Sequence, residues 1–256
     1  MWKSFMRQGL KNEMFYRISS KEQVVLILRS VIIVALINYC FYRHPFAFFI
    51  LFPIGVIYYR MEKKELLHQK KEEAREQFKD MLLLVVAGQK AGYSVENAFL
   101  KSYEDMNSLY GKDSSICKML ELFKREFTNH VPVFRIWIEI GINSEIEEIQ
   151  EFSEVFVIAK ENGGNMTTIM ERTAESISSK AETQKEIEAL LSARKLEQKI
   201  MSAMPFLLML YMNVTSPDYF DGLYHSVPGV ILMSICLLLY LMAYRMGVKI
   251  IHVYVS

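Results

Sequence analysis

Hydrophobic residues along the chain gather in two blocks, and a stretch rich in charged residues separates them. The first block covers residues 24–59 and the second covers residues 200–247. A helix rises about 1.5 Å per residue, so a span of the hydrocarbon core needs about 20 apolar residues. A polar turn interrupts each block, at residues 43–45 and at residues 216–227. The pattern therefore predicts two transmembrane hairpins with four spans in total.

The four predicted spans differ in length and in the polar residues that they carry. They are residues 24–42, 46–59, 200–215 and 228–244. A cleaved signal peptide at the first span is disfavoured, because no small-residue cleavage site follows it and a second apolar segment comes at once. Pro205 is expected to bend the third span near its start, since proline removes a backbone hydrogen bond. Arg29 lies near the start of the first span, and its long side chain is expected to reach the headgroups.

Residues 60–199 are predicted to form a domain of packed helices, because apolar residues recur there at intervals of three and four. The expected helices are residues 60–77, 78–86, 95–108, 115–127, 133–140, a helix opened by residues 144–147, and residues 166–206. Residues 78–86 are apolar nearly all round, which predicts a central, buried helix. Residues 133–140 are rich in β-branched side chains, but a lone strand would have no partner, so a helix is favoured. Ser144-Glu145-Ile146-Glu147 has the form of a capping box.

Two glycine-containing corners are the most distinctive local features of this middle domain. The first contains Gly88, Gly92 and Ser94, and the second contains Gly163, Gly164 and Asn165. The paired glycines of the second corner are expected to adopt positive φ, so that one helix ends and the chain reverses. Ser94 and Asn165 are each expected to cap the helix that follows. Together with Pro205, these residues are the candidate sites for packing or for coupling to a partner.

The first corner could be mistaken for a phosphate-binding loop. The Gly-Lys-Ser/Thr ending of such a loop is missing, and no predicted strand precedes the glycines. A packing corner is therefore the favoured interpretation. The two corners resemble each other, but we find no repeat of a whole domain in the sequence.

The stretch after the second corner is predicted to be one long helix with two different surroundings. Apolar residues recur at helical spacing from Ile169 to Ala181, and charged residues cover the other face as far as Lys195. The pattern then becomes apolar from Ile200 onward with no break. A helix exposed to water would thus continue directly into lipid and act as a mechanical link.

Charge sets the expected orientation of the chain in the membrane. The chain has 30 Lys and Arg and 29 Asp and Glu, a formal net charge of +1, so it has no strong footprint for nucleic acid. The N-terminal segment, residues 1–23, is basic and amphipathic; it either lies on an anionic membrane surface or serves as a positive flank. The positive-inside rule places both termini, including the tail at residues 248–256, and the middle domain in the cytoplasm.

The sequence contains no constellation of residues that indicates catalysis. The five histidines are scattered, and the three cysteines, Cys40, Cys117 and Cys236, are too far apart to suggest a disulfide framework or a metal site. No nucleophile elbow is present. We therefore expect no enzymatic activity, no cofactor and no metal.

Two sequence motifs resemble the signatures of a known family. Residues 87–98, Ala-Gly-Gln-Lys-Ala-Gly-Tyr-Ser-Val-Glu-Asn-Ala, resemble the first signature of the type II secretion system F-domain family. Residues 152–156, which lead to Glu161-Asn162-Gly163-Gly164-Asn165-Met166, resemble the second. The order of two spans, one helical domain and two spans is similar to the TadB branch of tight-adherence pilus proteins. The similarity covers roughly residues 77–244.

The resemblance implies a platform protein in the bacterial cytoplasmic membrane. Such a protein would sit beneath a pilus or secretion machine and contact a hexameric secretion ATPase in the cytoplasm. It would assemble with copies of itself or with a TadC-like sister protein, and it would pass motion to pilin subunits in the bilayer. Because the chain lacks a nucleotide-binding motif, the ATPase would have to supply the energy.

Two other classes of function remain open at the level of sequence. One is a membrane-bound enzyme or transporter with an unfamiliar site, and the other is a membrane sensor whose helical domain binds a ligand. No positive feature of the sequence favours either of them.

Overall fold

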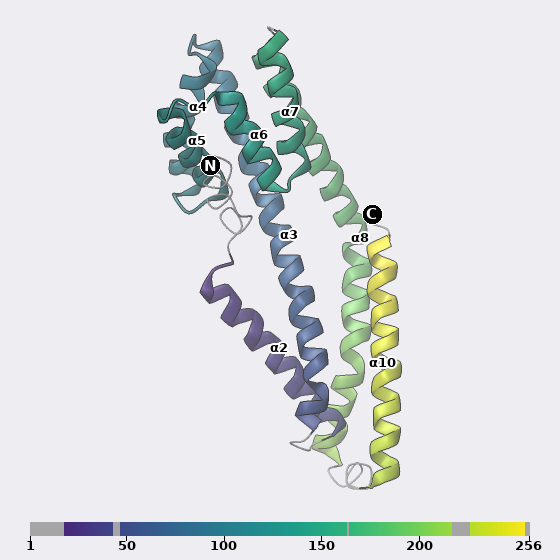
Figure 1. The fold of residues 1–256 in the computed structure, drawn as a ribbon. Coiled ribbons are helices and arrows are strands. Elements are labelled where there is room, and N and C mark those ends of the chain that lie inside the picture. The colour runs from purple at the N-terminus through teal and green to yellow at the C-terminus, as the bar shows by residue number, and fades with distance from the viewer. Residues whose placement is uncertain (1–17, 43–46, 163, 217–225, 254–256) are drawn as a thin grey trace. The chain divides into compact units, whose positions relative to one another are not determined.

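The computed structural model describes residues 18–42, 47–162, 164–216 and 226–253, and every regular element within these ranges is a helix (Figure 1). The helices are α2 (Ser20–Phe41), α3 (Ala47–Lys90), α4 (Val95–Tyr110), α5 (Ser115–Thr128), α6 (Val133–Ser144), α7 (Glu147–Asn162), α8 (Met166–Thr215) and α10 (Val227–Val253). The prediction of an all-α protein is confirmed for this part of the chain. The basic N-terminal segment lies mostly outside the described residues.

The chain forms two compact units, and two long helices contribute to both. Lys64–Glu182 belongs to one unit, which we call the helical domain. Ser20–Lys63 and the chain from Thr183 onward belong to the other, which we call the apolar unit. Helices α3 and α8 are each continuous across the boundary between the units. The predicted continuous helix after the second corner is confirmed, because α8 is a single helix.

The core of the helical domain is built around the indole ring of Trp137 on α6. Its centroid lies 5.9 Å from that of Phe78, 4.8 Å from that of Phe99 and 5.3 Å from that of Phe152. All four side chains are buried. Because the three phenylalanines come from α3, α4 and α7, this aromatic cluster joins four helices, and each pair adds about 0.5–1.5 kcal/mol beyond simple burial.

Most apolar residues of the predicted central segment are buried, but Leu83 on α3 and Val155 on α7 are exposed. The segment of α3 at residues 78–86 is central as predicted, since Phe78, Met81 and Val85 have no exposed surface. Leu83 on the same segment is 48% exposed, so the segment is not buried on every side. Val155 on α7 is 45% exposed, although its neighbours Phe152 and Phe156 are buried in the core.

The predicted capping box at residues 144–147 is wrong. Ser144 is the last residue of α6, is fully buried, and donates its hydroxyl to the carbonyl of Gly141 at 2.9 Å. Its oxygen accepts a hydrogen bond of 3.3 Å from the N–H of Ile146, whereas a capping box would require one from the N–H of Glu147. Glu145 adopts a left-handed conformation with φ 52°, and α7 then begins at Glu147. The apolar face of α6 continues past Ile140, so the helix extends over the serine that the motif would have used as a cap.

Among the residues that the structure describes, two helices of the apolar unit are long and apolar enough to cross a membrane. They are Ser20–Phe41 and Pro228–Gly247. The other two predicted spans, residues 46–59 and 200–215, are the ends of the longer helices α3 and α8. Many large apolar side chains on all four segments are exposed. Such extensive apolar surface indicates that something other than water covers it.

Side chains from all four segments form the interior of the apolar unit. The ring of Phe206 on α8 lies 6.2 Å from that of Phe41 on α2 and 5.2 Å from that of Tyr240 on α10. A hydrogen bond of 2.8 Å joins the hydroxyl groups of Tyr42 and Ser234. Gly55 on α3 approaches α2 so closely that a Cβ there would lie 2.9 Å from Val34. These contacts pack two hairpins against each other.

Arg29 has a partner within the apolar unit. Its Nη1 lies 3.5 Å from Oε2 of Glu62 on α3. The other oxygen of that carboxylate, Oε1, accepts a hydrogen bond of 2.8 Å from the hydroxyl of Tyr58. The expectation that Arg29 lies near a span end is compatible with this pair, because Glu62 follows the second predicted span. The pair adds a specific contact between α2 and α3 that the sequence did not predict.

Candidate functional site

The first glycine corner ends α3 with two characteristic backbone hydrogen bonds. The N–H of Gly92 donates to the carbonyl of Gln89 at 2.9 Å, and the N–H of Tyr93 donates to that of Gly88 at 3.1 Å. Gly92 has a φ of 93°, which favours glycine. This combination is a Schellman motif, so the predicted role of Gly92 at a helix C-terminus is confirmed.

The same corner starts α4 and brings it close to α3. The hydroxyl oxygen of Ser94 accepts the N–H of Asn97 at 3.3 Å, which confirms Ser94 as the N-cap. Gly88 lies inside α3, where a Cβ would be only 3.2 Å from the Cβ of Ala98 on α4. Gly88 therefore serves close helix packing, whereas Gly92 serves the turn.

The second corner joins α7 to α8 with similar geometry. The N–H of Gly164 donates to the carbonyl of Ala159 at 2.7 Å, and the side-chain oxygen of Asn165 accepts the N–H of Thr168 at 3.3 Å. Asn165 therefore caps α8 as predicted. Gly163 lies outside the described residues. The positive φ predicted for the glycine pair is not found at Gly164; a Cβ there would instead lie 3.1 Å from the Cβ of Ala159, so a close contact explains this glycine.

The two corners contact each other through reciprocal polar pairs. Lys160 of the second corner donates to Glu96 of the first at 2.9 Å. Thr167 of the second corner donates to Gln89 of the first at 3.0 Å. Residues 89 and 160 are 71 positions apart, and so are residues 96 and 167. Equivalent positions therefore exchange partners, as they do in an interface between two-fold-related copies.

The equivalence extends from the corners into the core of the helical domain. At the same offset, five pairs of apolar residues are all at most 1% exposed: Phe78 and Ile149, Met81 and Phe152, Val85 and Phe156, Phe99 and Met170, Met106 and Ile177. Even a buried polar position is shared, since Gln77 corresponds to Glu148. The helical domain thus contains two related helix–corner–helix motifs. Only the corners were apparent from the sequence, although the shared spacing of apolar residues could have revealed the rest.

Glu148 on α7 binds cations from both long helices. Its two carboxylate oxygens accept hydrogen bonds from Arg75 on α3 at 2.8 Å and from Lys180 on α8 at 3.1 Å. The side chain is only 3% exposed. Burial raises the pKa of Glu148, but hydrogen bonds from its own backbone N–H and from Lys180, with the charge of Arg75, outweigh burial and hold the pKa below its ordinary value. No local motif predicts this cluster, because Arg75, Glu148 and Lys180 are far apart in the sequence.

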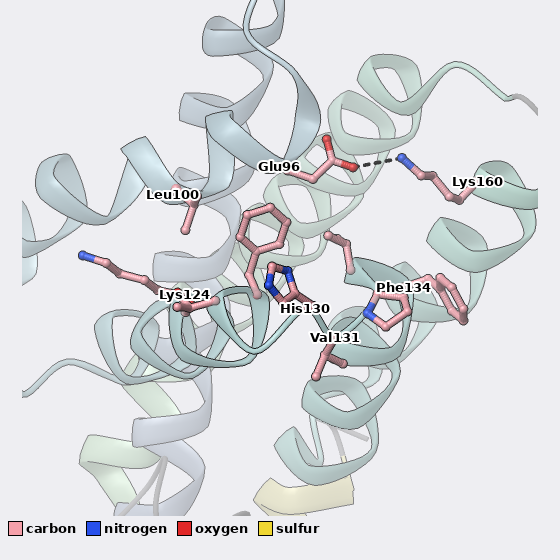
Figure 2. A pocket seen from close by; sticks show the side chains of 11 residues that line it. Glu96, Leu100, Lys124, His130, Val131, Phe134 and Lys160 are labelled. Carbon is pink, nitrogen blue, oxygen red and sulfur yellow. Dashed lines mark hydrogen bonds and ion pairs between the residues drawn. The ribbon is translucent and has the colours of Figure 1, made fainter.

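A groove opens beside the contact between the corners (Figure 2). Its volume is about 910 Å³, and α4, α5, α6, α7 and the segment between α5 and α6 line it. Leu100, Phe127, Val131, Pro132, Val133 and Phe134 supply its apolar lining. The charged and titratable groups at the groove are Glu96, Lys124, His130 and Lys160. Burial raises the pKa of Glu96, but the hydrogen bond from Lys160, a hydrogen bond from the backbone N–H of Glu96 itself and the charge of Lys160 together outweigh burial and lower the pKa overall.

The structure brings the two corners together but not the last candidate residue. Pro205 lies inside α8 in the apolar unit, next to the aromatic contacts of Phe206. Among the described residues, no cluster of His, Cys, Asp or Glu could hold a metal ion. None of the three cysteines forms a disulfide, and Cys40 and Cys117 are buried. The contacts described at the two corners position helices relative to one another.

Comparison of the chain with protein-family models, with curated proteins and with solved structures returned no match.

Proposed function

We propose that the chain is a membrane platform of a pilus or secretion machine of the type II secretion F-domain kind. It would couple a cytoplasmic hexameric ATPase to the assembly of pilin subunits in the bilayer. In this proposal the apolar unit spans the bacterial cytoplasmic membrane four times, and the helical domain lies in the cytoplasm. Energy comes from the partner, and the chain itself transmits motion.

The observation that carries the proposal is the continuity of α8. The helix begins at the second corner, where Asn165 caps it, and ends within the apolar unit at Thr215. Near its start it is bound to the rest of the helical domain through Thr167 and Lys180. A displacement of the helical domain would therefore be applied directly to a helix that continues into the apolar unit, because a helix is stiff along its axis.

The free apolar surface and the charge distribution support the membrane part of the proposal. The exposed apolar side chains of α2 and α10 suit contact with lipid, and Ser20–Phe41 and Pro228–Gly247 have sufficient length. The lysines and arginines of the chain lie mainly outside the predicted spans, which favours a cytoplasmic helical domain.

Site-specific crosslinking in cells that make the machine tests the proposal. Single cysteines are placed at exposed positions of the helical domain, in a variant in which the three native cysteines are replaced by alanine. We expect crosslinks to the secretion ATPase or to a sister platform protein. A cysteine at Leu232, an exposed apolar residue of the apolar unit, serves as the matched control and should not trap the ATPase. Absence of both crosslinks from every position in the helical domain would contradict the proposal.

A further inference from the structure

We infer that the groove beside the corners is a docking site for an acidic, amphipathic segment of a partner protein. The segment would place neighbouring apolar side chains on the groove floor and carboxylates at its rim. The inference rests on the proposed function in one respect, namely that the chain works by contacting other proteins. It adds the surface and the chemistry of the segment that binds there.

The floor of the groove suits apolar side chains. Val131 and Val133 are buried, while Phe127 and Phe134 are only partly covered and pack against the domain core. Because the lining comes from several helices and a connecting segment, the shape of the floor is fixed by the domain fold. Filling the groove would remove apolar surface from water, which is the main source of affinity at protein interfaces.

The rim of the groove suits carboxylates. Figure 2 shows Lys124 and Lys160 on opposite sides, with His130 between them. Among the described residues that line the groove, Glu96 is the only acidic one, and its carboxylate already pairs with Lys160 at 2.9 Å. Lys124 lies 6.0 Å from the centre of the Tyr103 ring and has no ion pair with a carboxylate in the described part of the chain. An acidic segment would meet cations there, and a basic one would be repelled.

His130 occupies a backbone position where glycine is the usual residue. Its φ is 59°, and its N–H donates to the carbonyl of Phe127 at 3.0 Å, while that of Val131 donates to Glu126 at 3.0 Å. This is the same helix ending as at Gly92, but with a side chain that lines the groove. The imidazole can donate a hydrogen bond to a carboxylate in either protonation state.

Docking would also act on the contact between the two corners. A carboxylate of the partner at this end of the groove would compete with Glu96 for Lys160, which lies on α7 just before the second corner. Since that corner starts α8, an occupant that separated Lys160 from Glu96 would change a contact next to the start of the long helix. The groove therefore links partner binding to the element that we propose transmits motion.

Selection from a random peptide library tests the inference on the full-length protein in lipid nanodiscs. We expect enrichment of peptides that carry Asp or Glu beside Leu, Ile or Phe. Binding of the enriched peptides should weaken about tenfold in Lys124→Glu. It should remain unchanged in Lys112→Glu, which makes the same charge change at an exposed residue outside the groove. The fluorescence of Trp137, recorded in a Trp2→Phe background, verifies that each variant is folded.

Several results would overturn the inference. The first is that no peptides are enriched on the wild-type protein relative to the Lys124→Glu protein. The second is that basic or uncharged peptides are enriched, and the third is that Lys124→Glu leaves the binding of the enriched peptides unaffected. Enriched peptides that match a segment of this chain would assign the groove to a second copy instead. The selection is independent of the crosslinking experiment: acidic peptides can bind the groove when no ATPase is trapped, and an ATPase can be trapped elsewhere when no peptide binds.

Discussion

Two kinds of residue hold the helices of the helical domain in place: glycines that allow close packing, and a buried glutamate that pairs with cations. Gly88 and Gly164 belong to the first kind, because a Cβ at either position would lie within 3.2 Å of an alanine Cβ. Glu148 belongs to the second kind, because it is buried and holds Arg75 and Lys180. Both determine how accurately α3, α7 and α8 are held, so substitutions there should alter stability and assembly together.

Replacement of Gly164 tests the packing role. Gly164→Val should destabilise the helical domain by about 1–3 kcal/mol, since the added atoms overpack the contact with Ala159. Gly164→Ala adds only the Cβ and should cost less. Thermal unfolding of the full-length protein, followed by Trp137 fluorescence in a Trp2→Phe background, measures both effects. Equal stability of the valine variant and the wild type, with normal pilus assembly, would show that this corner tolerates a side chain.

Replacement of Glu148 tests the charge cluster and predicts a dependence on pH. The pKa of Glu148 is lowered in the folded protein, so its carboxylate stabilises the fold above the ordinary pKa of glutamate, and this contribution is lost as pH falls through the folded pKa. Glu148→Gln should therefore cost about 2 kcal/mol near neutral pH and progressively less in acid. Urea unfolding at several pH values measures the difference. Glu147→Gln is the control at an exposed neighbouring residue and should change the free energy of unfolding little. A loss of stability in Glu148→Gln that is as large in acid as at neutral pH would contradict the stabilising role of the carboxylate.

At the scale of elements, the sequence predicted the helices and their ends better than the contacts between them. The caps at Ser94 and Asn165 and the turn at Gly92 were predictable because they depend on residues within a few positions. The contact of Gln89 with Thr167 was not, since it depends on how four helices pack. The capping pattern at Ser144 did not form a cap, because it lies inside the longer apolar face of α6.

Helix α8 carries the strongest prediction at this scale. Ser192 is an exposed residue of the charged stretch, and Ser192→Pro should break the helix there at a cost of about 3 kcal/mol. The helical domain, which ends at Glu182, should still fold and leave Trp137 fluorescence unchanged. Pilus assembly should be lost, whereas Ser192→Ala should assemble normally. Normal assembly by the proline variant, at equal expression, would mean that α8 does not need to be continuous.

At the scale of the whole molecule, a folded helical domain and an apolar unit share two uninterrupted helices. The aromatic core around Trp137 keeps the domain compact, and the reciprocal corners fix where α4 and α8 begin. The apolar unit has its own interior, in which Val34, Cys40 and Leu51 are buried and against which Phe206 packs, and it has an apolar exterior that suits lipid. The account of force transmission requires that the helical domain face the cytoplasm, where an ATPase could reach it.

The side of the membrane on which the helical domain lies tests this requirement most directly. A cysteine at the exposed residue Lys112, in a variant without the native cysteines, is treated with a maleimide that does not cross membranes. If the helical domain lies in the cytoplasm, this cysteine will be labelled in inverted membrane vesicles and will not be labelled in intact spheroplasts. Labelling in intact spheroplasts would place the helical domain outside the cytoplasm and contradict the proposed coupling to a cytoplasmic ATPase.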